Sequence, residues 1–160
     1  SRGASWKEVD PPSNVRAMPP SRVVRSSLPL QMLFFFNQWY DLLYRIVMLC
    51  LFGWKGNWLP YPGDMRALLG LEIAMVIVLG IVEYTRLFLG SRGNKTETVG
   101  PLVWSLVLSA PALVAYVYYL RLQIFVTGLD LVLNGIGVGF VAWEVLLGMF
   151  TIVTFVKAQR

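Results

Sequence analysis

The chain contains four apolar segments, and each is long enough to cross a lipid bilayer as a helix. They cover about residues 30–52, 65–88, 102–125 and 131–156. A helix needs about 20 apolar residues to cross a hydrocarbon core of about 30 Å, and it satisfies its own backbone hydrogen bonds there. Charged residues make up only 14% of the chain, against about 25% in soluble domains. The sequence therefore predicts an all-α membrane protein with a four-helix transmembrane domain over residues 28–160.

The connections at 53–63 and 127–130 are short. Short connections make neighbouring helices pack antiparallel, so we expect two antiparallel hairpins.

Lysine and arginine are unevenly distributed between the two sides of the predicted domain. Three lie on the side of the short connections, namely Lys55, Arg66 and Arg121. Ten lie on the side of the N-terminal segment, namely Arg2, Lys7, Arg16, Arg22, Arg25, Arg86, Arg92, Lys95, Lys157 and Arg160. Because cytoplasmic loops carry the excess of positive charge, this count predicts that both termini and the 90–100 loop are cytoplasmic. Asn94 begins a glycosylation sequon, and a cytosolic position predicts that it stays unmodified.

Residues 1–27 form a basic arm that contains four prolines and lacks hydrophobic periodicity. Proline in this pattern discourages helix, so we expect an extended or disordered arm. Arg22 and Arg25 precede the first apolar segment, where they could contact anionic lipid.

Residues 81–94 join the end of the second apolar segment to a basic turn that contains glycines. Glu83 and Arg86 are three residues apart, which suits an ion pair on one face of a helix, and Gly90 is the expected helix terminator. Two roles are open for this cytoplasmic helix-end pair: it seals the helix, or it offers a docking edge to a partner. The second role predicts that Arg86→Ala loses assembly and keeps its four spans.

Polar residues also fall inside the first two apolar segments. Asn37, Asp41 and Arg45 follow one another at four-residue steps, so they share a helix face, and Asp41 can pair with Arg45. Glu72 is expected at a similar depth in the second segment and is an alternative partner for Arg45.

The fourth segment carries Asn134 and, near its middle, Glu144. Glu144 has no basic partner in its own helix, so we expect it to be neutral by desolvation or paired with another subunit. We favour the interpretation that the polar groups of the spans are internal contacts that set helix register and partners. The alternative is a proton or ion pathway built from Asp41, Arg45, Glu72 and Glu144.

Gly135 and Gly139 give the fourth segment a small-xxx-small spacing. Such spacing permits the close approach of another helix, and the third helix of the same chain is the expected neighbour.

The sequence is poor in residues for catalysis. It contains no histidine, one cysteine (Cys50) and no glycine-rich phosphate loop, and it shows no nucleophile with a base beside it. We therefore predict a non-enzymatic protein without catalytic residues, cofactor, metal, nucleic-acid partner or small-molecule substrate.

Several short motifs resemble the transmembrane protein 216 family, which is related to transmembrane proteins 17 and 80. They are the run SLPLQMLFFFNQWY at residues 27–40, LPYP at 59–62, and a set of later positions in the expected order. That set comprises Glu83, Arg86, Leu87, Phe88, Gly90, Gly93, Asn94, Pro101, Tyr118, Tyr119, Gln123, Leu133, Asn134, Gly135 and Glu144. The resemblance covers about residues 27–155 and omits Asp41 and Arg45.

The resemblance implies a four-span, non-enzymatic component of the ciliary transition zone. Such a protein would serve the Meckel/tectonic-type membrane assembly, which supports cilium formation and gates membrane traffic into the cilium, with other membrane subunits and the bilayer as its partners. Two alternatives stay open, a small proton- or ion-conducting protein and an accessory subunit of another large membrane complex.

Overall fold

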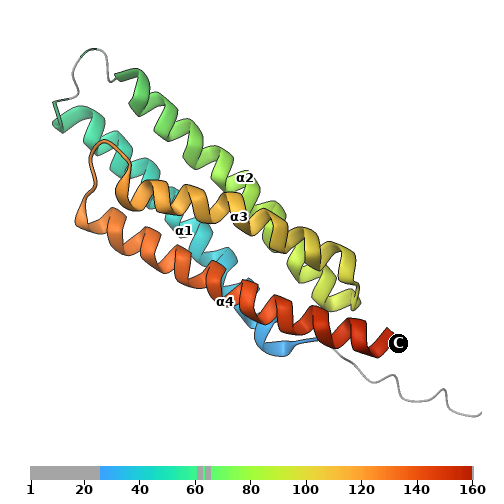
Figure 1. The fold of residues 1–160 in the computed structure, drawn as a ribbon. Coiled ribbons are helices and arrows are strands. Elements are labelled where there is room, and N and C mark those ends of the chain that lie inside the picture. Colours follow the sequence, from blue (N-terminus) through green and yellow to red (C-terminus); the bar gives the residue numbers. More distant parts are fainter. Residues whose placement is uncertain (1–25, 61–62, 64–65, 160) are drawn as a thin grey trace, which may run out of the picture.

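A computed structural model describes residues 26–60, 63 and 66–159 as an all-helical protein. Its four helices are α1 (Leu28–Trp58), α2 (Arg66–Thr96), α3 (Val99–Arg121) and α4 (Gly128–Gln159), as Figure 1 shows. The all-α prediction is confirmed for this part of the chain. Residues 1–25 of the expected N-terminal arm lie outside the described residues.

Three of the helices in the described part of the chain are long and apolar enough to cross a membrane: α2, α3 and α4. Helix α1 has 31 residues, as many as α2, but it is not among these three.

Three polar residues of α1, namely Asn37, Asp41 and Lys55, lie on its buried face. The buried positions of α1 are Leu30, Phe34, Asn37, Asp41, Tyr44, Met48, Phe52 and Lys55. Steps of three and four residues place all of them on one side of a helix. The other side exposes large apolar side chains, among them Phe36, Trp39 and Leu43.

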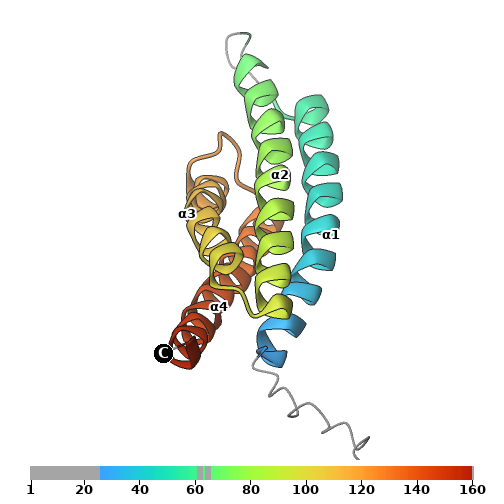
Figure 2. The ribbon, with the colours of Figure 1, turned by 90° about the vertical axis from the view of Figure 1, so that its right-hand side faces the viewer.

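Helices that are consecutive in the chain pack against each other, and α4 also packs against α1. Figures 1 and 2 show the resulting bundle from two sides. Leu30 and Phe34 of α1 cluster with Leu87 of α2, Leu102 of α3 and Phe155 of α4. This cluster brings the start of α1, the second half of α2, the start of α3 and the end of α4 to one end of the bundle.

Helix α2 was predicted to end at Gly90, but it continues to Thr96. Its end is made by Glu97, whose φ of 54° is left-handed, and by a hydrogen bond from Thr98 N–H to the Gly93 carbonyl of 3.0 Å. This is the hydrogen bond of a Schellman motif with a non-glycine residue in the left-handed position. Gly90 is needed for packing instead, because a Cβ there would lie 2.5 Å from the Phe34 ring.

The predicted role of Gly135 and Gly139 in packing on the third helix is wrong. A Cβ at either position would meet no other atom within 4 Å. The close approach between α3 and α4 uses Gly137, where a Cβ would lie 2.6 Å from the Tyr116 ring. Each residue turns a helix by about 100°. The glycine spacing can therefore suit close helix packing and still lie on a face of α4 that does not contact α3.

Candidate functional site: a buried charge network between the helices

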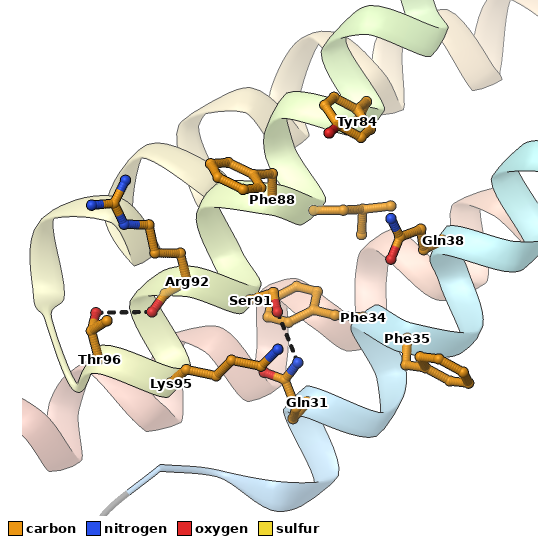
Figure 3. A pocket seen from close by; sticks show the side chains of 11 residues that line it. Gln31, Phe34, Phe35, Gln38, Tyr84, Phe88, Ser91, Arg92, Lys95 and Thr96 are labelled. Carbon is orange, nitrogen blue, oxygen red and sulfur yellow. Dashed lines mark hydrogen bonds between the residues drawn. The ribbon is translucent and has the colours of Figure 1, made fainter.

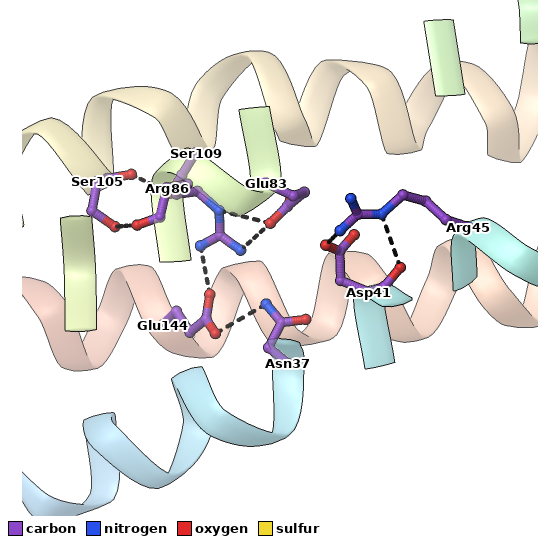
Figure 4. Close-up of polar contacts among 8 residues, drawn as sticks. All are labelled: Asn37, Asp41, Arg45, Glu83, Arg86, Ser105, Ser109 and Glu144. Carbon is purple, nitrogen blue, oxygen red and sulfur yellow. Dashed lines mark hydrogen bonds and ion pairs between the residues drawn. The ribbon is translucent and has the colours of Figure 1, made fainter. Parts of the chain in front are cut away.

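The centre of the bundle contains an arginine held between two carboxylates. Arg86 of α2 donates to Glu83 Oε2 from Nε at 3.0 Å and from Nη2 at 2.6 Å. Its Nη1 lies 2.5 Å from Glu144 Oε2 on α4. Arg86 and Glu83 are fully buried, and Glu144 is 1% exposed. Figure 4 shows the guanidinium between the two acids.

The network extends to the two remaining helices through neutral polar groups. Asn37 of α1 donates from Nδ2 to Glu144 Oε1 at 3.0 Å. Ser105 of α3 donates to the backbone carbonyl of Arg86 at 2.8 Å. All four helices therefore meet at one charge-bearing centre (Figure 4).

This geometry corrects two expectations about Glu83, Arg86 and Glu144. The partner of Glu144 is Arg86 of the same chain, which the spacing within one helix could not reveal. Arg86 lies ten residues before the end of α2, about 15 Å along the axis, and is buried. It is therefore neither a helix-end seal nor a docking edge for a partner.

Asp41 and Arg45 form the predicted ion pair within α1, and Glu72 takes no part in it. The Arg45 side chain is 29% exposed, in contrast to the buried Asp41. Glu72 accepts from Ile124 N–H at 3.0 Å and from the Tyr118 hydroxyl at 3.4 Å, so it ties α2 to the chain after α3. Glu72 is therefore not the ion-pair partner of Arg45.

Three oxygens in this region are buried without a hydrogen-bond partner among the described residues: Asn37 Oδ1, Asp41 Oδ1 and Glu83 Oε1. An unsatisfied buried acceptor costs about 1–3 kcal/mol. Within the described part of the chain, no three His, Cys, Asp or Glu side chains are placed to hold a metal ion. The arrangement can orient helices and hold charge, and it contains no nucleophile beside a base.

A second buried ion pair, between Lys55 of α1 and Asp130 of α4, was missed in the sequence. Lys55 Nζ lies 2.5 Å from Asp130 Oδ2, and both side chains have no exposed surface. Asp130 also accepts from Thr127 N–H at 2.8 Å, and Thr127 Oγ1 accepts from Asp130 N–H at 3.3 Å. This reciprocal arrangement is a capping box at the start of α4. In the sequence, this capping box is indicated by Thr127 three residues before the acid Asp130.

Helices α1 and α4 are joined by further polar contacts between these two ion-pair sites. Tyr44 donates to Asn134 Oδ1 at 2.8 Å, and Tyr40 donates to the Leu133 carbonyl. Asn134 thus lies on the α1–α4 seam and anchors itself by a 2.8 Å bond to the Asp130 carbonyl.

Asn94 holds the start of α1 against the end of α2. Its Oδ1 accepts from Ser27 N–H at 2.9 Å, and its Nδ2 donates to the Ser27 carbonyl at 2.8 Å. The side chain is 1% exposed. The Asn94 amide therefore ties the two helix ends together.

Comparison with known proteins gives a consistent set of relatives. The family model Transmemb_17, described as a predicted membrane protein, matches residues 32–141. Transmembrane protein 216 of Rattus norvegicus is 39% identical over 135 residues, which cover 84% of this chain and 94% of the relative. The protein of that name from Homo sapiens is 39% identical over 130 residues, with 81% and 88% covered. The Danio rerio protein is 38% identical over 136 residues, with 85% and 83% covered. No solved structure matches this chain.

Proposed function

The chain belongs to the transmembrane protein 216 family of predicted membrane proteins, and we propose that it is a non-enzymatic structural subunit of a multi-subunit membrane assembly. From the resemblance noted in the sequence, we propose that this assembly is that of the ciliary transition zone. There the protein would support cilium formation and the gating of ciliary membrane traffic.

The proposal includes α1 as the fourth membrane span, in an arrangement of two antiparallel hairpins. Its support is the burial pattern of α1, in which Asn37, Asp41 and Lys55 face the bundle while most large apolar side chains, such as Phe36, Trp39 and Leu43, face outward. A span with polar groups on its inner face does not expose them to lipid. At about 1.5 Å per residue its 31 residues exceed the thickness of the hydrocarbon core.

We further propose that both termini are cytoplasmic. Arg86 and Lys55 no longer count as loop charges, since both are buried in ion pairs. Removing one residue from each side leaves nine basic residues on the side of the termini against two on the other. The asymmetry that supports the orientation is therefore kept.

The observation that carries the structural role is the burial of Arg86 between Glu83 and Glu144. Charges inside a membrane are expensive, and they are retained where they serve the fold or the function. Here the guanidinium bonds both carboxylates within the chain, so this charge pairing joins α2 to α4 inside the bundle. Binding to other subunits is then left to the outward faces, which expose large side chains such as Trp104, Trp143 and Phe150.

Purification of the tagged chain from native membranes tests this function. We expect other membrane proteins to co-purify in fixed stoichiometry, and the tagged chain to form a band at the ciliary base in fluorescence microscopy. A monomer spread evenly over the cell surface would contradict the proposal.

A second candidate function is proton conduction, and the unpaired oxygens of Asn37, Asp41 and Glu83 favour it. Buried unpaired acceptors are sites where a proton or water could be held. Its test is proton flux into vesicles that contain the purified protein, with Glu83→Gln as the variant. Flux that disappears in Glu83→Gln would support this candidate, and the absence of flux in the unaltered protein would remove it.

A further inference from the structure

A groove lies between α1 and α2, at the end of the bundle where α1 begins and α2 ends (Figure 3). Its volume is about 380 Å³. Its walls include the rings of Phe35, Tyr84 and Phe88, which are 56%, 58% and 54% exposed. These rings make an apolar surface that is large enough to hold a hydrocarbon chain.

The side chains of α2 that line this groove change in character along the helix. Tyr84 and Phe88 come first, and Arg92 and Lys95 follow. Steps of four, four and three residues keep all four on one side of α2. The distance from Phe88 to Lys95 is about 10 Å along the axis. The groove is thus aromatic toward the middle of the bundle and cationic at its end.

The two cations are available for a ligand. None of the ion pairs formed among the described residues includes Arg92 or Lys95, and both side chains are exposed. Next to them, Gln31 donates to Ser91 Oγ at 2.8 Å. Figure 3 shows the Lys95 side chain extending toward Gln31, with Arg92 on the α2 side of the groove.

A second hollow of about 310 Å³ adjoins the groove, lined by Met32 and Phe36 and by three residues that also line the groove: Gln31, Phe35 and Lys95. The two hollows therefore meet at the ring of Phe35 and at one cation. A ligand with two hydrocarbon chains and one anionic head has this shape.

We propose that this site binds one anionic glycerophospholipid, with its phosphate at Lys95 and Arg92 and one acyl chain in each hollow. Basic pockets between transmembrane helices on the cytoplasmic side bind acidic lipid headgroups. The inference rests on the proposed function in that α1 and α2 are placed in the bilayer as neighbouring spans, with this end of the bundle at the cytoplasmic surface. It adds a lipid that would help to seat this end of the bundle at the membrane surface.

Native mass spectrometry of the purified protein tests the site. The protein is mixed with phosphatidic acid or phosphatidylcholine in mild detergent, and retained lipid is counted for each variant. We expect retention of one phosphatidic acid, and Arg92→Gln combined with Lys95→Gln should weaken its binding at least about tenfold. The matched control is Arg66→Gln combined with Arg121→Gln, which removes two charges at the other end of the bundle and should leave retention unchanged.

Three results would overturn the proposal. Equal losses in the two double variants would mean attraction by overall charge, and equal retention of phosphatidylcholine would mean a site without charge selectivity. Full competition by glycerol 3-phosphate, which has the headgroup and no acyl chains, would mean a free-phosphate site. The assay reads lipid binding without reference to partners or orientation. A protein that lacks the lipid and still assembles would therefore refute this inference and leave the proposed function standing.

Discussion

At the scale of single residues, the contacts of Arg86 explain why the bundle can bury three charged groups at its centre. A guanidinium is planar and presents several donors in a fixed geometry, so it can bond two carboxylates at once. Arg86 uses this geometry toward Glu83 at 2.6 Å and Glu144 at 2.5 Å. Lysine has one compact charge and cannot reproduce both contacts.

Arg86→Gln should destabilise the fold, because it leaves Glu83 and Glu144 buried without a cation. Breaking a buried ion pair by removing one partner costs about 3–5 kcal/mol. Arg86→Lys keeps the charge and should fall between Arg86→Gln and the unaltered chain. The measurement is thermal unfolding of the purified protein in detergent, followed by circular dichroism.

The control for this series is Arg66→Gln, which removes an exposed arginine at the start of α2 and should leave the unfolding temperature unchanged. An Arg86→Gln protein that unfolds at the temperature of the unaltered chain would show that the network is not needed for stability. The earlier expectation that Arg86→Ala keeps its spans and loses only assembly is replaced by this one.

At the scale of helices, the packing of α2 on α3 depends on a glycine near their joint end. A Cβ at Gly93 would lie 2.7 Å from the backbone nitrogen of Leu102. Backbone atoms cannot move aside as the tip of a side chain can, so the helices would have to separate. The tight two-residue connection between α2 and α3 leaves little freedom for that shift.

Gly93→Ala should therefore destabilise the bundle by about 1–3 kcal/mol, as overpacking does in other cores. The matched control is Gly135→Ala in α4, where a Cβ meets no atom within 4 Å. Alanine is the better helix former, so this control should be neutral or more stable than the unaltered chain. Equal unfolding temperatures for the two variants would refute the close approach of α2 and α3.

At the scale of the whole molecule, polar contacts tie both ends of the bundle. Asn94 joins the start of α1 to the end of α2, and Lys55 joins the end of α1 to the start of α4. These two ties lie at opposite ends of α1, and they match opposite membrane surfaces in the proposed arrangement.

Cysteine labelling tests the proposed orientation. Cys50 is the single cysteine of the chain and is first replaced by serine. Gly63→Cys and Gly100→Cys then mark the two sides, because a side chain at either glycine meets no atom within 4 Å. We expect a membrane-impermeant maleimide to label Gly63→Cys in intact cells, and Gly100→Cys only after permeabilisation. The reverse result would invert the topology, and labelling of both in intact cells would contradict the four-span arrangement.

Local properties of the sequence were enough to predict the helices and the candidate polar residues. Each apolar segment is recognised from a run of consecutive residues, without knowledge of the rest of the fold. The predicted segments fall within or close to α1, α2, α3 and α4. The four-residue step from Asp41 to Arg45 likewise determines a contact inside one helix, and the structure contains it. The family was also recognisable from short motifs, and the relatives confirm it.

Only the tertiary structure decided which polar groups meet across helices. Glu144 pairs with Arg86 and accepts a hydrogen bond from Asn37. Glu72 accepts a hydrogen bond from Ile124 N–H and does not pair with Arg45. Each outcome depends on the rotation of a helix about its axis and on its shift against its neighbours, and a turn of about 100° per residue exchanges an inward face for an outward one. The same physical reason separates Gly137, which packs on Tyr116, from Gly135, which meets nothing.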